Sequence, residues 1–232
     1  MKEKIRAIVL AGGQGKRMNS SIPKQYIEID GYPVLYYSLK ELEQSEVEEI
    51  ILVVGRGETE YVQKNIVEKY AFQKIMKIVS GGKERYESVY HGLQEIQDDG
   101  YVLIHDGARP LLSQDIIKKG IEEVKQCGAC VIGMPVKDTI KIVDEKQYVK
   151  DTPNRRYLWL VQTPQIFKTK DIKEAYEKMW KIGDGEVTDD AMVMEKYGCL
   201  NVKLVEGEYQ NIKVTTPEDI LIASLLLKHK NI

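Results

Sequence analysis

The 232-residue sequence has little net charge, few cysteines and no long apolar run, and each shortage excludes a class of protein. Its 34 basic and 36 acidic side chains leave a formal net charge of -2, so the composition predicts neither a nucleic-acid nor an anionic-membrane partner. The first apolar stretch, residues 5–10, is much shorter than a membrane span or the apolar segment of a signal peptide. We therefore expect a cytoplasmic protein.

The three cysteines are Cys127, Cys130 and Cys199, and the first two form a CxxC pattern that is compatible with a redox or zinc site. The sequence has no second CxxC and no nearby pair of histidines to complete such a site. Gly128 has the position of a residue that ends a helix, and Cys130 begins an apolar strand pattern. We interpret these cysteines as small buried apolar side chains.

Apolar strand patterns alternate with amphipathic helical patterns, which predicts a mainly parallel sheet with helices on both faces. Thr216 and Pro217 begin one late helix. The run TDDA at 188–191 begins another that ends at Gly198, although its two acids can also serve a ligand or a partner. The fold class is α/β, a three-layer Rossmann-like sandwich in one domain over residues 1–232. We expect strands near 5–10, 50–54, 75–79, 101–104, 129–134 and 202–205, and helices over 34–44, 58–70, 84–96 and 115–126.

A segment at about 136–162 departs from this alternation and predicts a projecting β-arm. The runs TIKIV (139–143) and QYVK (147–150) alternate polar with apolar residues around a turn, and YLWLV (157–161) is a further extended piece. A hairpin alone is only marginally stable, and this one carries Tyr148, Tyr157 and Trp159. Its support comes either from another subunit or from burial against the parent domain.

The run LAGGQGKRM (10–18) directly follows the first strand and is followed by PKQ (23–25). Three glycines within four residues allow close backbone approach, and the exposed N–H groups of such a turn form a nest for an anion. Arg17 and Lys24 add two positive charges that can neutralise charge on a phosphorus during displacement. The alternative is an ordinary turn between strand and helix with solvated basic side chains.

Two better-known phosphate motifs do not match this loop. A Walker loop requires Ser or Thr after its lysine, whereas Lys16 is followed by Arg17. A dinucleotide fingerprint requires a third glycine where Met18 stands and an acidic residue after the next strand, and 50–55 ends in glycine. Both kinase-type phosphoryl transfer and hydride transfer are therefore disfavoured.

Polar residues also follow the third and fourth predicted strands, where ligands bind in open α/β sheets. They form the loops SGGKER (80–85), with Ser88 one turn further, and HDGARP (105–110). Asp106 can either bind Mg²⁺ or stabilise a turn, and we expect a structural role for His105. Arg109 can reach a phosphate or a carboxylate. Lys213 is either solvated or a third cation at the site.

Several separated motifs, which follow one another in the family's order, make the chain resemble the 2-C-methyl-D-erythritol 4-phosphate cytidylyltransferase family. Besides the loop 11–18, they include GGKER with Ser88, HDGARP, and PVKDTIK (135–141) with QTPQ (162–165). VTDDA (187–191) and NIKVTTPED (211–219) follow. The resemblance spans almost the whole chain. It implies a nucleotidyltransferase fold and transfer of CMP from CTP to the sugar-alcohol phosphate, in isoprenoid precursor biosynthesis.

The resemblance also implies roles for individual residues. Asp106 would lie at Mg²⁺, and Arg17, Lys24 and Lys213 would face the triphosphate. The family is a homodimer whose arms cross over, so Thr139, Arg155 and Arg109 would complete the sugar-phosphate pocket of the other subunit, alongside Thr163 and Thr188. The implied CTP-binding residues are Ala11, Gly12, Gly13, Gly81, Gly82, Arg85 and Ser88.

Departures from the family pattern are few. The family often has two alanines where this chain has Ala11 and Gly12, and Asn154 replaces a frequent Asp. The spacer 19–23 also resembles ribitol 5-phosphate cytidylyltransferases, which keeps that substrate as an alternative. A nucleotide-binding regulator without chemistry is an alternative from another class, disfavoured by the retained cations.

Overall fold

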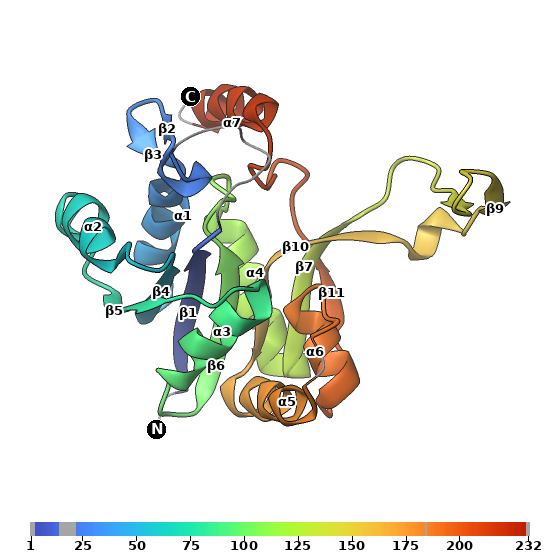
Figure 1. The fold of residues 1–232 in the computed structure, drawn as a ribbon, viewed down its shortest axis with the longest axis horizontal. Helices are drawn as coiled ribbons and strands as arrows, with labels where there is room; N and C mark the ends of the chain where they lie inside the picture. The colour runs from blue at the N-terminus through green and yellow to red at the C-terminus, as the bar shows by residue number, and fades with distance from the viewer. Residues whose placement is uncertain (1–2, 14–21, 184, 231–232) are drawn as a thin grey trace.

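The computed structural model describes residues 3–13, 22–183 and 185–230, and its centre is a seven-stranded sheet. The strand order is β11-β7-β10-β6-β1-β4-β5 (Figure 1), and β10 runs antiparallel to β6 and β7 while the other pairs are parallel. The predicted mainly parallel α/β sheet is confirmed. The strands are β1 (Lys4–Ala11), β4 (Glu49–Val54), β5 (Ile75–Ser80), β6 (Gly100–Asp106), β7 (Ala129–Pro135), β10 (Trp159–Lys168) and β11 (Lys203–Glu206).

Helices cover both faces because successive side chains of each strand point to opposite sides. Ala7 and Val9 of β1 pack in a cluster with α1 (Val34–Glu43), with α2 (Thr59–Val62) and its continuation η3 (Gln63–Glu68), and with α4 (Gln114–Cys127). Ile8 packs on the other side with α3 (Arg85–Gln94), α5 (Thr169–Ile182) and α6 (Asp190–Tyr197). These three layers match the predicted sandwich.

A third apolar cluster joins α7 (Pro217–Lys230) to a small hairpin of β2 (Glu28–Ile29) and β3 (Tyr32–Pro33). Ile29, Val34 and Leu227 are buried in this cluster. The cluster also contains Val214, so the loop before α7 packs together with this helix. The sequence analysis did not anticipate the hairpin.

The largest difference from expectation concerns β10 and α5. Trp159 was expected in the arm, but it begins β10 and pairs with Pro135 of β7. The strand continues through QTPQ to Lys168 with a register shift between Val161 and Gln165, and this polar run hides the strand pattern. Helix α5 was not predicted, although its buried side chains recur at helical spacing: Ile172, Ala175, Tyr176 and Met179.

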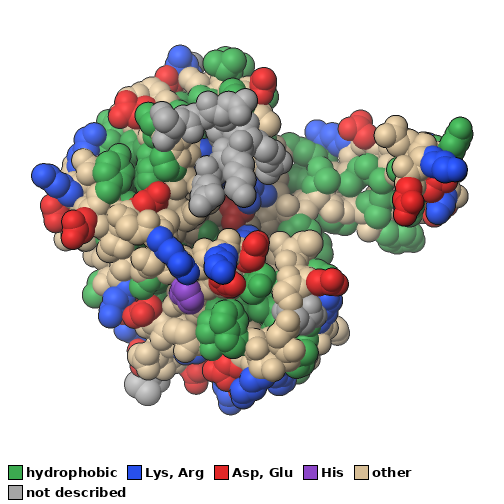
Figure 2. All heavy atoms as spheres, viewed as in Figure 1, with side chains coloured by type: hydrophobic (Ala, Val, Ile, Leu, Met, Phe, Trp, Pro, Cys, Tyr) green, Lys and Arg blue, Asp and Glu red, His purple; other side chains and the backbone are tan. Residues whose placement is uncertain are grey.

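The predicted arm projects from the ends of β7 and β10 (Figure 1). It contains β8 (Ile142–Val143), β9 (Val149–Asp151) and the short 3₁₀ helix η4 (Arg155–Tyr157). Tyr148 is 71% exposed and Tyr157 is 81% exposed, so the parent domain does not cover them. Figure 2 shows hydrophobic side chains on the open surface of the arm.

The cysteine interpretation is confirmed for Cys130, which is buried, whereas Cys127 is only half-buried. All three cysteines are free. Gly128 ends α4 in the left-handed conformation, with φ 79°.

Among the described residues, none of the helices has both the length and the apolar character that a bilayer crossing requires.

Two glycines that end helices form a matched pair for a stability test. Gly183 ends α5 with φ 76°, and a Cβ built there meets no heavy atom within 4 Å. A Cβ on Gly128 would lie 3.0 Å from Cδ1 of Leu200. We expect Gly183→Ala to lower the free energy of unfolding by about 1 kcal/mol because of the left-handed backbone. Gly128→Ala should lower it further because of crowding.

Urea unfolding of both variants measures these losses. Unchanged stability in both would contradict the left-handed helix ends.

Candidate active site

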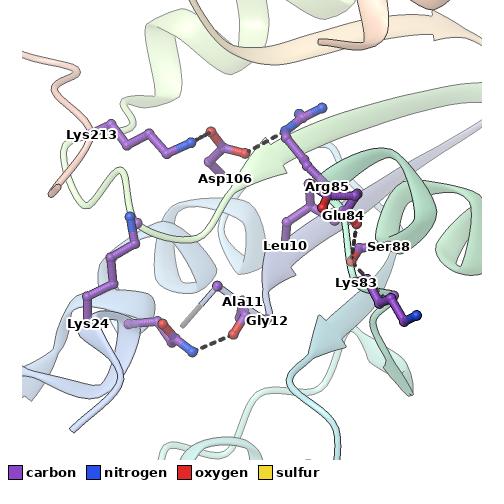
Figure 3. A pocket seen from close by; sticks show the side chains of 14 residues that line it. Leu10, Ala11, Gly12, Lys24, Lys83, Glu84, Arg85, Ser88, Asp106 and Lys213 are labelled. Atoms are coloured by element: carbon purple, nitrogen blue, oxygen red, sulfur yellow. Dashed lines mark hydrogen bonds and ion pairs between the residues drawn. The ribbon is translucent and has the colours of Figure 1, made fainter. Parts of the chain in front are cut away.

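A cavity lies at the carboxyl ends of β1 and β6 (Figure 3). It is lined by the end of β1 with the loop after it, the 3₁₀ helix η2 (Lys24–Tyr26), the start of α3 with its preceding loop, the end of β6, and the loop before α7. The lining residues are Leu10, Ala11, Gly12, Gly13, Lys24, Gln25, Gly82, Lys83, Glu84, Arg85, Ser88, Asp106, Ala108 and Lys213. Segments far apart in sequence therefore meet at the expected edge of the sheet.

The first glycine loop is packed closely against its neighbours. A Cβ on Gly12 would lie 3.3 Å from the carbonyl atoms of Val54, so the loop passes close to the end of β4. The buried side chain of Gln25 donates from Nε2 to the carbonyl oxygen of Ala11 at 2.6 Å. Gln25 belongs to the PKQ motif, but the sequence pattern alone indicates no role for it. Arg17 lies outside the described residues.

The second glycine loop is held in shape by Ser88. The N–H of Gly82 donates to Ser88 Oγ at 3.1 Å, and that hydroxyl donates to the Glu84 carbonyl at 3.2 Å. The N–H of Gly81 donates to the Val54 carbonyl at 2.7 Å, and a Cβ on Gly81 would lie 2.7 Å from Ser88 Oγ. Both glycine loops thus meet at the end of β4.

Asp106 lies between two cations (Figure 3). Its Oδ1 accepts from Arg85 Nε at 3.2 Å, and its Oδ2 accepts from Lys213 Nζ at 2.6 Å. Burial raises the pKa of Asp106, but the positive charges of Arg85 and Lys213 outweigh burial and hold it well below its usual range. Asp106 is therefore an ionised carboxylate at the cavity.

Arg85 continues this arrangement away from the cavity. Its Nη1 and Nη2 donate to the two oxygens of Asp190 at 2.9 and 2.8 Å. Asp190 and Tyr176 are fully buried, and the Tyr176 hydroxyl donates to Asp190 at 2.6 Å. Asp189 caps α6 by accepting from the N–H of Met192 at 3.0 Å. The predicted helix start is confirmed, and Asp190 contacts Arg85 instead of facing solvent.

Two of the three cations expected at the triphosphate, Lys24 and Lys213, meet at the loop before α7. Lys24 Nζ donates to the Val214 carbonyl at 2.9 Å, one residue after Lys213. The N–H of Val214 donates to the Ala108 carbonyl at 2.8 Å, which fixes this loop to the end of β6. Lys24, Lys213 and Asp106 therefore line the same cavity.

Two buried polar residues, Thr163 and His105, lie next to Asp106 on the side of the protein interior. The N–H of Asp106 donates to Thr163 Oγ1 at 3.1 Å, and the same hydroxyl lies 3.1 Å from His105 Nδ1. Burial lowers the pKa of His105 to about 3, so its ring is neutral at physiological pH. This agrees with the structural role expected for His105. The Thr163 hydroxyl is likewise engaged within the protein.

The remaining predicted substrate residues have separate locations. Arg109 donates from Nη1 to the Asn211 carbonyl at 2.6 Å. Thr188 is exposed near the start of α6, with Oγ1 3.7 Å from Met192 Sδ. Thr139 and Arg155 are exposed on the arm, and Arg155 donates to the Lys137 carbonyl at 2.9 Å. The arm residues thus lie away from the cavity of their own chain (Figure 1).

The donor set at the cavity suits a divalent cation that takes most of its ligands from phosphates. The described part of the chain contains no group of three or more His, Cys, Asp or Glu side chains placed to hold a metal. A cation bound to a triphosphate needs only one or two protein carboxylates. Asp106 meets this requirement because its two oxygens can accept more than the two interactions they make here.

Comparison with known proteins gives a consistent result. The family model described as 2-C-methyl-D-erythritol 4-phosphate cytidylyltransferase matches residues 5–229. A protein of that name from Lachnospira eligens is 55% identical over 96% of this chain and 98% of its own length. Another, from Lachnoclostridium phytofermentans, is 48% identical over 97% of each chain. A crystal structure of 4-diphosphocytidyl-2C-methyl-D-erythritol synthase from Anaerococcus prevotii is similar with a TM-score of 0.85 and 39% identity, covering 97% and 96% of the two chains.

The buried His105 predicts a specific dependence of stability on pH. The groups that act on it are Asp106, Arg109 and Lys213. The unfolded chain protonates this histidine near pH 6.5, whereas the folded protein keeps it neutral to about pH 3, so stability is lost as the pH falls below 6.5. Between pH 7 and 5, the wild type should lose about 2 kcal/mol more unfolding free energy than His105→Gln.

Urea unfolding of both proteins at the two pH values measures this difference. Equal losses would contradict a neutral His105.

Proposed function

The chain belongs to the 2-C-methyl-D-erythritol 4-phosphate cytidylyltransferase family, and from this premise we propose how its residues carry out the reaction. The enzyme is a nucleotidyltransferase that transfers CMP from CTP to 2-C-methyl-D-erythritol 4-phosphate and releases pyrophosphate, a step of isoprenoid precursor biosynthesis. The observation that carries the residue assignment is the meeting of two glycine loops with Asp106, Lys24 and Lys213 at one cavity.

The reaction is an in-line displacement. A phosphate oxygen of the sugar-alcohol phosphate attacks the α-phosphorus of CTP, a new P–O bond forms, and the bond to the β-phosphate oxygen breaks. The nucleophile is already an anion, so the protein needs no general base. Its task is to align two anionic reactants and offset their repulsion.

We assign the triphosphate to the side of the cavity that carries Lys24 and Lys213, with Arg17 as a third cation. Charge moves onto the departing pyrophosphate in the transition state, and fixed cations beside it stabilise that charge most strongly in a site that excludes water. The assignment is supported by Lys213 being held at 2.6 Å from Asp106 and Lys24 at 2.9 Å from the Val214 carbonyl.

The glycine loops are the proposed binding surface for the nucleoside and α-phosphate. Backbone N–H groups near Gly12 and Gly13 can donate to phosphate oxygens, and the loop held by Ser88 borders the space for base and ribose. The proposed nucleotide-binding set is Ala11, Gly12, Gly13, Gly81, Gly82, Arg85 and Ser88.

We propose Mg²⁺ as the divalent cation and Asp106 as its protein ligand. When bound, the ion would neutralise charge on the triphosphate and on the leaving pyrophosphate. Asp106 is suited to this position because its pKa is lowered, which keeps it ionised. Arg85 and Lys213 hold the carboxylate in one orientation.

The proposal takes residues 1–232 as one domain that works as a homodimer in the cytoplasm. Free cysteines are typical of a reducing compartment. The exposed aromatic side chains of the arm favour cover by a second copy. Thr139, Arg155 and Arg109 would then complete the sugar-phosphate pocket of the partner, together with Thr163 and Thr188.

Removal of either lysine tests the cation assignment. Lys24→Ala and Lys213→Ala should each lower kcat by about 10²-fold or more, the usual scale for loss of one electrostatic stabiliser. Lys119→Ala, which removes an exposed lysine on α4, should leave kcat unchanged. Pyrophosphate release is measured with CTP and 2-C-methyl-D-erythritol 4-phosphate, with ribitol 5-phosphate as the competing substrate. Near-normal turnover in both site variants would refute the assignment.

Mixed dimers test the exchanged arm. Arg155→Ala removes an arm residue, whereas Lys24→Ala removes a residue of the glycine-loop site, and each variant alone should have low activity. If the arm serves the partner, a subunit exchange of the two variants restores about a quarter of wild-type activity, because half of the dimers contain one complete site. A mixture of Lys24→Ala with Lys213→Ala should restore nothing. No recovery in the first mixture would show that the arm does not serve the partner.

A further inference from the structure

Five side chains form a continuous polar row that runs from the interior to the cavity. Tyr176 donates to Asp190 at 2.6 Å, Asp190 binds both Nη atoms of Arg85, and Arg85 donates from Nε to Asp106 at 3.2 Å. Lys213 completes the row at 2.6 Å from Asp106. The row crosses α5, α6, α3, β6 and the loop before α7.

Stability alone does not account for this row. Asp190 and Tyr176 are fully buried, and the desolvation of buried charges offsets most or all of their mutual attraction. Apolar side chains of similar volume often give an equally stable core. The row instead reaches Asp106 and Lys213, which both border the cavity.

Asp190 is fixed in place by its neighbours in the helix. Gln165 of β10 donates to Asp189 Oδ2 at 2.9 Å and accepts from the N–H of Ala191 at 2.8 Å. The start of α6 is therefore bound to the sheet on both sides of Asp190. A carboxylate held this way fixes the plane of the Arg85 guanidinium through two parallel hydrogen bonds.

We propose that Asp190 is a positioning residue for the cytidylyl transfer, acting through Arg85. It holds the guanidinium so that Nε meets Asp106 Oδ1, which leaves Oδ2 for Lys213. It also balances the charge of Arg85, so that Arg85 does not compete with Lys213 for Asp106. The inference rests on the proposed function, because its consequence is the alignment of groups that face the triphosphate.

Asp190→Asn is the direct test because it keeps the size of the side chain and an acceptor for Tyr176 while it removes the charge. We expect kcat to fall about tenfold or more, since small misalignments at a reacting centre have large effects on rate. The KM for CTP should change less than about threefold, because Arg85 is the one member of the proposed nucleotide-binding set that Asp190 contacts and the glycine loops are untouched. Glu195→Gln, an exposed change on the same helix, should match the wild type in both constants.

A double variant separates positioning from folding. If Asp190 acts only through Arg85, then Arg85→Gln with Asp190→Asn should have a kcat no lower than Arg85→Gln alone. Tyr176→Phe removes only the hydroxyl that donates to Asp190 and should lower kcat a few-fold with an unchanged KM. This variant tests the same proposal if Asp190→Asn does not fold.

A folded Asp190→Asn enzyme with kcat within twofold of the wild type would overturn the inference. So would losses that multiply in the double variant. If Asp190→Asn does not fold, an unchanged kcat in Tyr176→Phe would overturn it equally. Absence of pyrophosphate release by the wild type would instead refute the proposed function, so the two failures are distinguishable.

Discussion

The site depends on one carboxylate held between two cations. Asp106 accepts from Arg85 on one oxygen and from Lys213 on the other, and its N–H is anchored to the buried Thr163 hydroxyl. These contacts leave an ionised group with a single orientation in a cavity otherwise suited to anions. A reaction between two phosphates needs such an arrangement, because the main obstacle is the repulsion of the reactants and not the lack of a base.

The fold provides this placement through the order of its strands. β1 and β6 are neighbours in parallel register, so the first glycine loop and Asp106 end at the same edge of the sheet. The antiparallel β10 lies beside β6, so the Thr163 hydroxyl accepts a hydrogen bond from the N–H of Asp106. The loop before α7 lines the cavity with Lys213, and the next residue of this loop, Val214, is buried in the α7 cluster. Each functional side chain lies on a loop or at a strand end, and the buried element next to it fixes its position.

Much of this site could be predicted from sequence because polar residues after parallel strands converge at one edge. That rule placed Asp106 and the second glycine loop at this edge, whereas the position of Lys24 and Lys213 at the triphosphate was implied by the family resemblance. The partnership of Arg85 with Asp190 was inaccessible, since it spans 105 residues and depends on how α5 and α6 pack against α3. Only the start of β10 was expected, as an extended piece over 157–161, because the polar run QTPQ masks a strand that is buried between two others. Helix α5 was missed although its buried side chains recur at helical spacing.

The central claim is that Lys24 and Lys213 face the phosphates of CTP beside the first glycine loop. The most direct measurement is a crystal structure of the enzyme with bound CTP. The account predicts triphosphate oxygens within hydrogen-bond distance of both ammonium groups and of the backbone N–H groups near Gly13. A nucleotide bound elsewhere, with those ammonium groups pointing into solvent, would contradict it.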